Sequence, residues 1–256
     1  MKEDVAIKVL MQVKEVLDKQ GVEYWIDMGT LLGAVRDGKI IPWDTDIDLG
    51  IWDNDFDEVA KACMVLRGKG FKIYFGINHV GIFKYKNGVE YLVGISAYTL
   101  NNNQALLTWF VHSKERYYDD TKIVKRKTQQ RIRLLLEYFV WLLSAPIYSG
   151  DNPKFIPYKV QIALVKFCHI IPTRLRELLT KALLLFFKIF GCKYLFLEIP
   201  SNYFKDLSRM KFYGMEFNIP SKAEEYLEYK YGQEWRTPQK KWIYYTDDGA
   251  ITRNLK

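Results

Sequence analysis

Residues 41–48 of this 256-residue chain are IPWDTDID, with aspartate at every second position. If this stretch is a strand, the two-residue period of its side chains places Asp44, Asp46 and Asp48 on one face. Three like charges on one face repel each other, so the arrangement is costly without a cation. Hard divalent cations with oxygen ligands, Mg²⁺ or Mn²⁺, suit such a face. The alternative is a solvated acidic loop after Pro42, because short acidic motifs also arise by chance.

Upstream of this stretch the sequence predicts a site for phosphate. An apolar strand at 24–26 is followed by Gly29 and Thr30 and then by a helix that starts near Leu31. Glycine lets the backbone approach a ligand closely, and a helix N-terminus offers free N–H groups and the positive end of its dipole. Arg36 would add a cation for phosphate, unless it is a solvent-exposed helix arginine. A phosphate cradle that faces a carboxylate strand is what metal-assisted phosphoryl or nucleotidyl transfer requires.

Hydrophobic periodicity along the chain predicts both helices and strands. We expect helices at 3–19, from Leu31 to a stop at Gly38, and at 53–68 with Asp53 as a candidate cap. We expect strands at 24–26, 44–50, 71–75, 80–86, 90–98 and 105–111. Residues 122–195 have a helical pattern, and 196–256 indicate short helices and turns rich in Tyr and Trp.

The composition is that of a globular protein, because 49% of the residues are hydrophobic and 27% are charged. The three cysteines form no CxxC pair, which argues against a thiolate zinc site and for a reducing compartment. His79, His112 and His169 also lack the spacing of a metal site, so we expect them in the core or on the surface. The N-terminus lacks the uncharged core of a signal peptide. We therefore expect a cytoplasmic protein.

Several of these stretches together resemble a known family, the LicD family, which includes bacterial phosphorylcholine transferases and the fukutin and fukutin-related proteins. The similar segments are GTLLGAVR at 29–36, IPWDTDID at 41–48, FYGMEFNIP at 212–220, EYLEYKYG at 225–232 and WRTP at 235–238. The resemblance covers roughly 24–98 and 200–242, in the order that the family has, and it is weak over 122–195.

The resemblance implies an α+β fold, namely a nucleotidyltransferase-like mixed sheet flanked by helices, with a basic and apolar helical insertion. We expect residues 1–121 to form the catalytic core and 200–256 to close it. Residues 122–199 would form the insertion, as a lid or as a membrane-facing element.

The resemblance also implies an enzyme that transfers a phospho-alcohol, such as phosphocholine or ribitol phosphate. The donor would be a nucleoside diphosphate compound similar to CDP-choline, and the acceptor a hydroxyl of a cell-surface glycan or a lipid-linked glycan. On matching positions, Asp46 and Asp48 would be the catalytic ligands of Mg²⁺ or Mn²⁺, and Asp44 would support them as a third carboxylate.

The donor phosphates would lie against the first motif. Gly29, Thr30 and Arg36 carry over from the family as contacts to these phosphates. Lys84, in the expected strand 80–86, is a further candidate for them, or else an outward-facing strand lysine.

One position departs from the family pattern. Family members usually have a third catalytic carboxylate on a later strand, and Gly94 stands at that place in LVGISAY, residues 92–98. Ser96 and Glu90 share the face of Gly94 but are not obvious replacements. The base that accepts the hydroxyl proton is therefore unassigned. Two alternatives stay open: a degenerate member that binds a nucleotide or a glycan without turnover, and a nucleotidyl or adenylyl transferase acting on another acceptor.

The charge of the chain is concentrated in its middle. Residues 122–200 carry 14 Lys and Arg against four acids, while the whole chain has a net charge of +8. Arg174, Lys181 and Lys188 are seven residues apart and form one helix stripe beside many Leu and Phe. This pattern suits an interfacial helix on anionic lipid at the inner face of a membrane, or a lid on the core with a solvated stripe. Nucleic acid ranks below lipid as a partner, because the basic residues interleave with long apolar runs.

Overall fold

The structure is a computed structural model. It describes residues 1–76, 78–111, 139, 142–143, 158–168, 170–172, 174–176, 178–179, 182–183, 193–244 and 246–251. By its internal contacts the chain divides into two compact units. The first consists of Met1–Ile73, Asn78–Leu107 and Phe196–Lys256, and the second of Tyr74–Ile77 and Thr108–Leu195.

The elements occur in a mixed order of helices and strands. The helices are α1 (Glu3–Lys19), α2 (Met28–Asp37), a 3₁₀ turn η1 (Asp53–Asp55), α3 (Phe56–Gly68), α5 (Tyr158–Cys168), α7 (Asn202–Lys205) and α8 (Ala223–Tyr231). The strands are β1 (Tyr24–Ile26), β2 (Asp46–Trp52), β3 (Lys72–Gly76), β4 (His79–Lys86), β5 (Val89–Asn101), β6 (Gln104–Val111), β7 (Lys193–Pro200), β8 (Leu207–Phe212) and β9 (Met215–Pro220).

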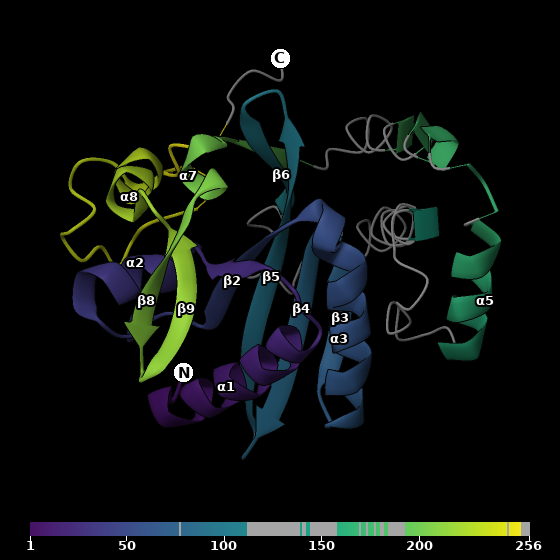
Figure 1. The fold of residues 1–256 in the computed structure, drawn as a ribbon, viewed down its shortest axis with the longest axis horizontal. Coiled ribbons are helices and arrows are strands. Elements are labelled where there is room, and N and C mark those ends of the chain that lie inside the picture. The colour runs from purple at the N-terminus through teal and green to yellow at the C-terminus, as the bar shows by residue number, and fades with distance from the viewer. Residues whose placement is uncertain are drawn as a thin grey trace, which may run out of the picture. The chain divides into compact units, whose positions relative to one another are not determined.

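The described strands form one mixed sheet and one hairpin. The sheet has seven strands in the order β1-β2-β5-β4-β3, with β6 pairing with β5 and β7, and β8 and β9 form the hairpin. The β2–β5 pair is parallel, whereas β1–β2, β4–β5 and β5–β6 are antiparallel. This combination of a mixed sheet with helices confirms the predicted α+β class (Figure 1).

Helix α1 illustrates how the sequence pattern forms the core. Its buried residues recur every three to four positions, which places them on one helix face. That face packs against α3 and β5. The buried residues are Val5, Ala6, Val9, Leu10, Val13, Val16 and Leu17.

An aromatic cluster ties the C-terminal segment to the sheet of the first unit. Trp25 of β1 stacks on Tyr98 of β5 and on Phe204 of α7, with ring centroids 5.9 and 5.0 Å apart. Trp25 pairs with Gly50 across β1 and β2, and a β-carbon at Gly50 would lie 2.4 Å from the indole ring. Glycine at position 50 therefore makes room for the tryptophan.

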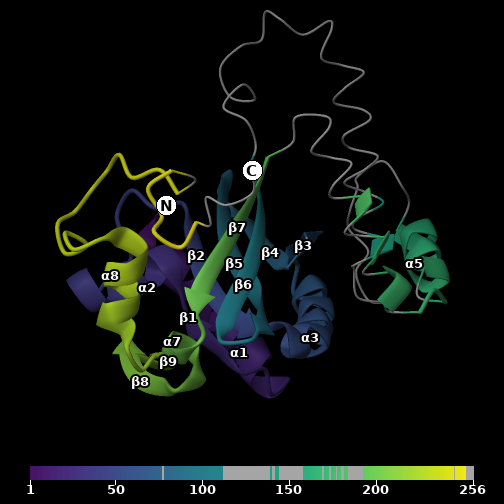
Figure 2. The same ribbon diagram turned by 90° about the horizontal axis from the view of Figure 1, so that it is seen from above.

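Segments that are far apart in the sequence lie side by side in the first unit. The β8–β9 hairpin contacts β1, and α8 contacts α2. Figure 2 shows α2 and α8 next to each other. Figure 1 shows the hairpin beside the end of the sheet where β2 lies. Residues after 200 thus complete the unit that begins at Met1.

The structure corrects three local predictions. Strand β2 begins at Asp46, so Asp44 precedes the strand and does not lie in it. Asp53 does not cap a helix, because η1 occupies 53–55 and α3 begins only at Phe56, without a side-chain hydrogen bond from its cap residue. Residues 196–256 contain β8, β9 and most of β7, although the sequence predicted only short helices and turns there.

The second unit contains α5 among its described residues. Arg176 donates from Nη1 to the carbonyl oxygen of Leu143 at 3.3 Å. The predicted basic patch at 122–133 and the stripe residues Lys181 and Lys188 lie outside the described residues. None of the helices that the structure describes has the length and apolarity needed to cross a membrane.

Candidate active site

The three aspartates Asp44, Asp46 and Asp48, here called the acidic triplet, converge near the start of β2. Asp46 and Asp48 are partly buried on one face of β2, while Ile47 is buried on the other. Asp44 reaches the same place from the turn before the strand, where its N–H donates to the carbonyl of Ile41 at 2.9 Å. The alternation predicted for positions 46 and 48 is therefore present, and Asp44 joins through a turn.

Like charges within the acidic triplet oppose ionisation. Burial, followed by the charge of Asp46 and the hydrogen bond that protonated Asp44 donates to it, raises the pKa of Asp44 to about 7. Burial, followed by the charges of Asp46, Asp44 and Asp27, raises the pKa of Asp48 well above its usual range. Lys230 opposes this shift at Asp48, but its effect is the smallest of the causes. The triplet thus carries more negative charge than its surroundings compensate.

The first turn of α2 lies directly against the acidic triplet. A β-carbon at Gly29 would be 2.6 Å from Asp44 Oδ2 and 3.5 Å from Asp48 Oδ2. A side chain at position 29 would push the Asp44 carboxylate aside, so the close approach expected of Gly29 is to the acidic triplet itself. The N–H groups of Gly29 and Thr30 belong to the first turn and have no partner within the helix. They can receive an anion beside the carboxylates.

Thr30 has a structural contact that the sequence did not predict. Its hydroxyl oxygen accepts a hydrogen bond from the backbone N–H of Asp48 at 2.8 Å, and its side chain is buried. This bond fixes α2 to β2 at Asp48, a member of the acidic triplet. Thr30 can contact a donor phosphate through its backbone N–H while its hydroxyl positions Asp48.

The structure does not bring Arg36 and Lys84 to the acidic triplet. Arg36 pairs with its neighbour Asp37, at 2.8 Å between Nη2 and Oδ2, and lies seven residues beyond Gly29, about 10 Å along the helix. Lys84 donates to the carbonyl of Lys69 at 2.7 Å, at the end of α3. Their contacts to donor phosphates stay predictions.

Gly94 lies beside the acidic triplet. It pairs with Asp48 across β2 and β5, and a β-carbon there would be 3.9 Å from Asp48 Oδ1. On its other side it pairs with Gly81 of β4. The ring of His79 occupies the adjoining space, with Cε1 3.0 Å from the same β-carbon position.

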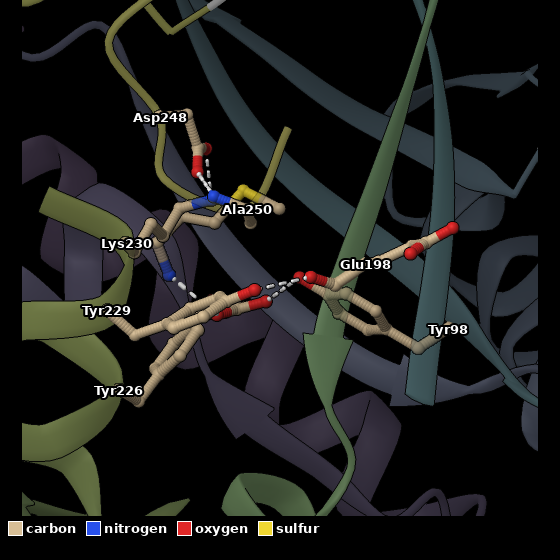
Figure 3. A network of polar contacts seen from close by, with 9 residues as sticks. Tyr98, Glu198, Tyr226, Tyr229, Lys230, Asp248 and Ala250 are labelled. Atoms are coloured by element: carbon tan, nitrogen blue, oxygen red, sulfur yellow. Dashed lines mark hydrogen bonds and ion pairs between the residues drawn. The ribbon is translucent and has the colours of Figure 1, made fainter. Parts of the chain in front are cut away.

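A second group of buried charges lies next to this site and was missed by sequence reasoning. We call it the paired cluster, and its members are Asp27, Tyr98, Tyr226, Lys230 and Asp248. Figure 3 labels the two tyrosines, Lys230 and Asp248. Asp27 accepts hydrogen bonds from the hydroxyls of Tyr98 at 2.7 Å and Tyr226 at 2.8 Å. Lys230 Nζ lies 2.5 Å from Asp248 Oδ2, and both side chains are almost fully buried.

The paired cluster holds the C-terminal segment against β1, α2 and β2. Asp27 caps α2, and its own N–H donates to the carbonyl of Asp48 at 3.1 Å. Burial raises the pKa of Asp27, while Lys230 and the two tyrosine hydroxyls oppose that shift. The segment 225–232 was singled out in the sequence, but its partner residues lie far away in the chain, so no local signal could pair them.

The oxygen donors of the triplet suit a hard divalent ion, and the uncompensated charge of Asp44 and Asp48 fits a cation there. Across the described ranges, however, no three His, Cys, Asp or Glu side chains are placed to hold an ion on their own. Two of the carboxylates together with substrate phosphate oxygens form the usual set for Mg²⁺ in transferase sites. The residues present fit an ion that is completed by a bound phosphate.

Comparison with protein families gives a match over residues 21–135 to the LicD/FKTN/FKRP nucleotidyltransferase domain. A curated relative, ribitol 5-phosphate transferase FKRP of Homo sapiens, is 53% identical over 53 residues, which are 21% of this chain and 10% of the relative. Ribitol-5-phosphate transferase FKTN of Homo sapiens is 41% identical over 71 residues, 28% of this chain and 15% of the relative. The matches thus span only a small part of the length of these relatives.

Among solved structures, a solution structure of the antibiotic-resistance factor ANT(2″)-Ia is similar with a TM-score of 0.32 and 15% identity. The similarity covers 74% of this chain and 96% of that chain.

Proposed function

Since residues 21–135 carry the nucleotidyltransferase domain of the LicD/FKTN/FKRP family, we propose that this chain is a transferase that moves a phospho-alcohol from a nucleoside diphosphate donor to a glycan hydroxyl. One observation supports the proposal most: the acidic triplet has excess negative charge and faces the free N–H groups of α2. Carboxylates beside an anion site are the arrangement that metal-assisted transfer from a diphosphate needs. The two named relatives are ribitol-phosphate transferases.

In this proposal each residue of the site has a separate role. Asp46 and Asp48 would hold Mg²⁺ or Mn²⁺ together with the diphosphate, and Asp44 would support them. When bound, the ion offsets the charge that develops as the phosphorus–oxygen bond breaks. The N–H groups of Gly29 and Thr30 would bind and orient the donor phosphates. The Thr30 hydroxyl would keep Asp48 in place through its backbone N–H.

The proposed donor is a cytidine diphosphate alcohol, with ribitol or choline as the alcohol, and the proposed acceptor is a cell-surface glycan or a lipid-linked glycan. The relatives' names favour the ribitol compound. Direct transfer would leave CMP as the second product.

The test is to incubate the purified full chain with Mn²⁺, a glycan acceptor and one of three donors, CDP-ribitol, CDP-choline or ATP, and to measure release of the nucleotide. We expect CMP from a cytidine donor and its loss in Asp46→Asn and Asp48→Asn. Asp53→Asn removes the same charge from the exposed η1 turn and should leave the rate unchanged. Release from ATP alone would favour nucleotidyl transfer, and no release from any donor would refute the enzyme.

Gly94 favours a second candidate function, binding of a nucleotide or a glycan without turnover. No carboxylate stands at the position beside Asp48 on β5. Calorimetry separates the two functions: binding of CDP-ribitol that does not need Mn²⁺, in a chain without turnover, would support the binding protein.

We also propose that the second unit contacts an anionic membrane surface, as a peripheral protein on its inner face. Several apolar side chains among its described residues are exposed, including Phe167 at 67%, Ile170 at 77% and Leu178 at 62%. Sedimentation with anionic vesicles at low salt should remove the protein from the supernatant, and 1 M salt should weaken this, since the Debye length falls to roughly 3 Å. Protein that stays in the supernatant at low salt would refute the proposal.

A further inference from the structure

The chain after α8 returns to the acidic triplet through two aromatic contacts. Lys240 Nζ lies 5.3 Å from the ring centroid of Trp43, which is the residue directly before Asp44. Two residues further on, the ring centroid of Trp242 lies 4.7 Å from that of Tyr231, the last residue of α8. These contacts connect the end of α8 with the turn that carries Asp44.

Helix α8 itself is fixed beside β2. Tyr226, five residues before Tyr231, donates its hydroxyl hydrogen to Asp27 at 2.8 Å. The backbone N–H of Asp27 donates in turn to the carbonyl of Asp48 at 3.1 Å. The phenol ring of Tyr231 is therefore carried by an anchored helix, and its contact with Trp242 holds the ring from the other side.

The hydroxyl of Tyr231 lies near the acidic triplet without being bonded to it. Burial, followed first by the charge of Asp48, raises the pKa of Tyr231 well above its usual range, and Asp44 adds to the shift. Such charge effects weaken with distance, so the hydroxyl is close to these carboxylates. Among the described residues, however, this hydroxyl has no hydrogen-bond partner, and its side chain is only half-buried. It is free to donate to a third group that binds at the triplet.

An anion bound beside the carboxylates suits this hydroxyl. A phenol keeps its proton at pH 7, so it offers a hydrogen-bond donor without adding another negative charge to the site. The oxygens of a diphosphate are strong acceptors, and hydrogen bonds to charged groups are stronger than those between neutral ones. The N–H groups of Gly29 and Thr30 offer donors from α2, and Tyr231 offers one from α8.

We propose that Tyr231 is a binding residue for the donor, and that its hydroxyl donates a hydrogen bond to an oxygen of the diphosphate. This inference rests on the proposed function, because it needs a nucleoside diphosphate at the acidic triplet. It gives the C-terminal segment a part in the site itself, beyond its part in completing the first unit.

The experiment is calorimetry of the full chain with CDP and Mn²⁺, in the wild type and in Tyr231→Phe. This variant keeps the ring that contacts Trp242 and removes only the hydroxyl. Loss of one hydrogen bond to a charged group should weaken the binding of CDP by about 10–100-fold. Tyr229→Phe is the matched control, because its hydroxyl donates to the carbonyl of Glu198 on the same helix, and it should bind CDP as the wild type does.

Two further measurements separate a phosphate contact from other roles. Cytidine, which has no phosphate, competes with CDP, and Tyr231→Phe should not weaken its binding. A loss shared by cytidine would assign Tyr231 to the nucleoside and overturn the proposal. The melting temperature of Tyr231→Phe should not fall, since the hydroxyl has no partner among the described residues. Weaker CDP binding together with a lower melting temperature would assign the hydroxyl to the fold, and unchanged CDP binding would also overturn the proposal.

The outcomes also distinguish this inference from the proposed function. A wild type that binds no CDP refutes the proposed function, and the role of Tyr231 with it. A wild type that binds CDP but releases no CMP from CDP-ribitol or CDP-choline refutes only the transfer. In that case the comparison with Tyr231→Phe still decides the role of Tyr231, because binding does not require turnover.

Discussion

Two groups of carboxylates lie side by side in the first unit, one buried and one half-buried, and they differ in how their charge is compensated. In the paired cluster, Asp27 has two tyrosine hydroxyls and a backbone N–H, and Asp248 has the ammonium of Lys230. In the acidic triplet, by contrast, Asp44 and Asp48 face other carboxylates. The charges of these neighbours raise their pKa values further, whereas the neighbours of Asp27 oppose the rise that burial causes there.

The difference indicates what each group is for. Buried charges in proteins are normally paired, since an unpaired buried charge is strongly destabilising. The paired cluster meets this requirement with the protein's own groups and therefore serves the fold. The acidic triplet does not meet it, and such a site is a candidate for binding a cation or for chemistry. The predictions below test whether the two groups behave as differently as their contacts indicate.

The largest effect is expected from removing the cation of the paired cluster. Lys230→Met leaves the buried carboxylate of Asp248 unpaired, which should lower the free energy of unfolding by about 3–5 kcal/mol. Urea denaturation followed by tryptophan fluorescence measures the change. In the double variant Lys230→Met/Asp248→Leu, most of the loss should be recovered, because no charge remains buried.

The control for this prediction is Lys222→Met, which removes an exposed lysine that pairs with Glu225 at 3.6 Å. Exposed ion pairs contribute at most about 1 kcal/mol, so this variant should change little. Equal losses in the two lysine variants would show that the paired cluster does not stabilise the fold more than a surface contact does.

The next effect concerns the hydroxyls that solvate Asp27. Tyr226→Phe removes one donor to this buried carboxyl group and should cost about 1–3 kcal/mol in the free energy of unfolding. Tyr229→Phe, on the same helix, removes a hydroxyl that donates to the carbonyl of Glu198 near the surface and should cost less than about 1 kcal/mol. A larger loss in Tyr229→Phe would contradict the importance of Asp27.

The acidic triplet should show the opposite response to neutralisation. Without metal, Asp44→Asn removes a repelled charge and should raise the free energy of unfolding on the order of 1 kcal/mol above pH 7. The folded pKa of Asp44, about 7, is above its value in the unfolded chain. The wild type is therefore stabilised by protonation, and the advantage of the variant should vanish as the pH falls from 7 to 4.

Asp37→Asn is the matched control for Asp44→Asn. A hydrogen bond from Arg36 lowers the pKa of Asp37, so its neutralisation removes a favourable contact and should not stabilise the protein at any pH. Denaturation curves in EDTA between pH 4 and 8 measure both variants. A stability gain for Asp37→Asn, or none for Asp44→Asn at pH 8, would mean that the charges of the triplet are already compensated.

The smallest effect compares two helical glycines. Gly68→Ala, at the end of α3, adds a methyl group with no atom within 4 Å and should raise the free energy of unfolding by about 0.5–1 kcal/mol. Gly29→Ala should gain nothing, because its β-carbon would lie 2.6 Å from Asp44 Oδ2. It should also weaken donor binding in calorimetry. Equal gains in the free energy of unfolding for both variants would show that the first turn of α2 is not in close contact with the acidic triplet.

Much of the fold could be predicted from local patterns. The helix at 3–19 was predicted with its observed bounds, and the stop at Gly38 coincides with a left-handed residue that ends α2. The shared face of Asp46 and Asp48 follows from the strand period alone. The strands from 71 to 111 were also predicted to within a few residues, because their apolar runs are bounded by turn residues.

The sequence was less informative where a residue depends on its neighbours in space. It placed Asp44 in the strand, although a turn carries that side chain to the others. It missed β8 and β9, whose short patterns become strands only by pairing with each other. Arg36, from the resemblance, and Lys84, from its place in a strand, stay predictions as donor contacts; the sequence did not show that Arg36 pairs with Asp37 or that Lys84 donates to the Lys69 carbonyl.

The sequence by itself indicated the resemblance to the LicD family, the α+β class and a strand with two carboxylates on one face, because motifs and periodicity are properties of neighbouring residues. Only the tertiary structure decided which charges are compensated. Lys230 and Asp248 are paired by the fold, and His79 meets Gly94 because β4 and β5 lie side by side. Coulomb energy and desolvation depend on distance and burial in space, and no one-dimensional pattern contains those distances.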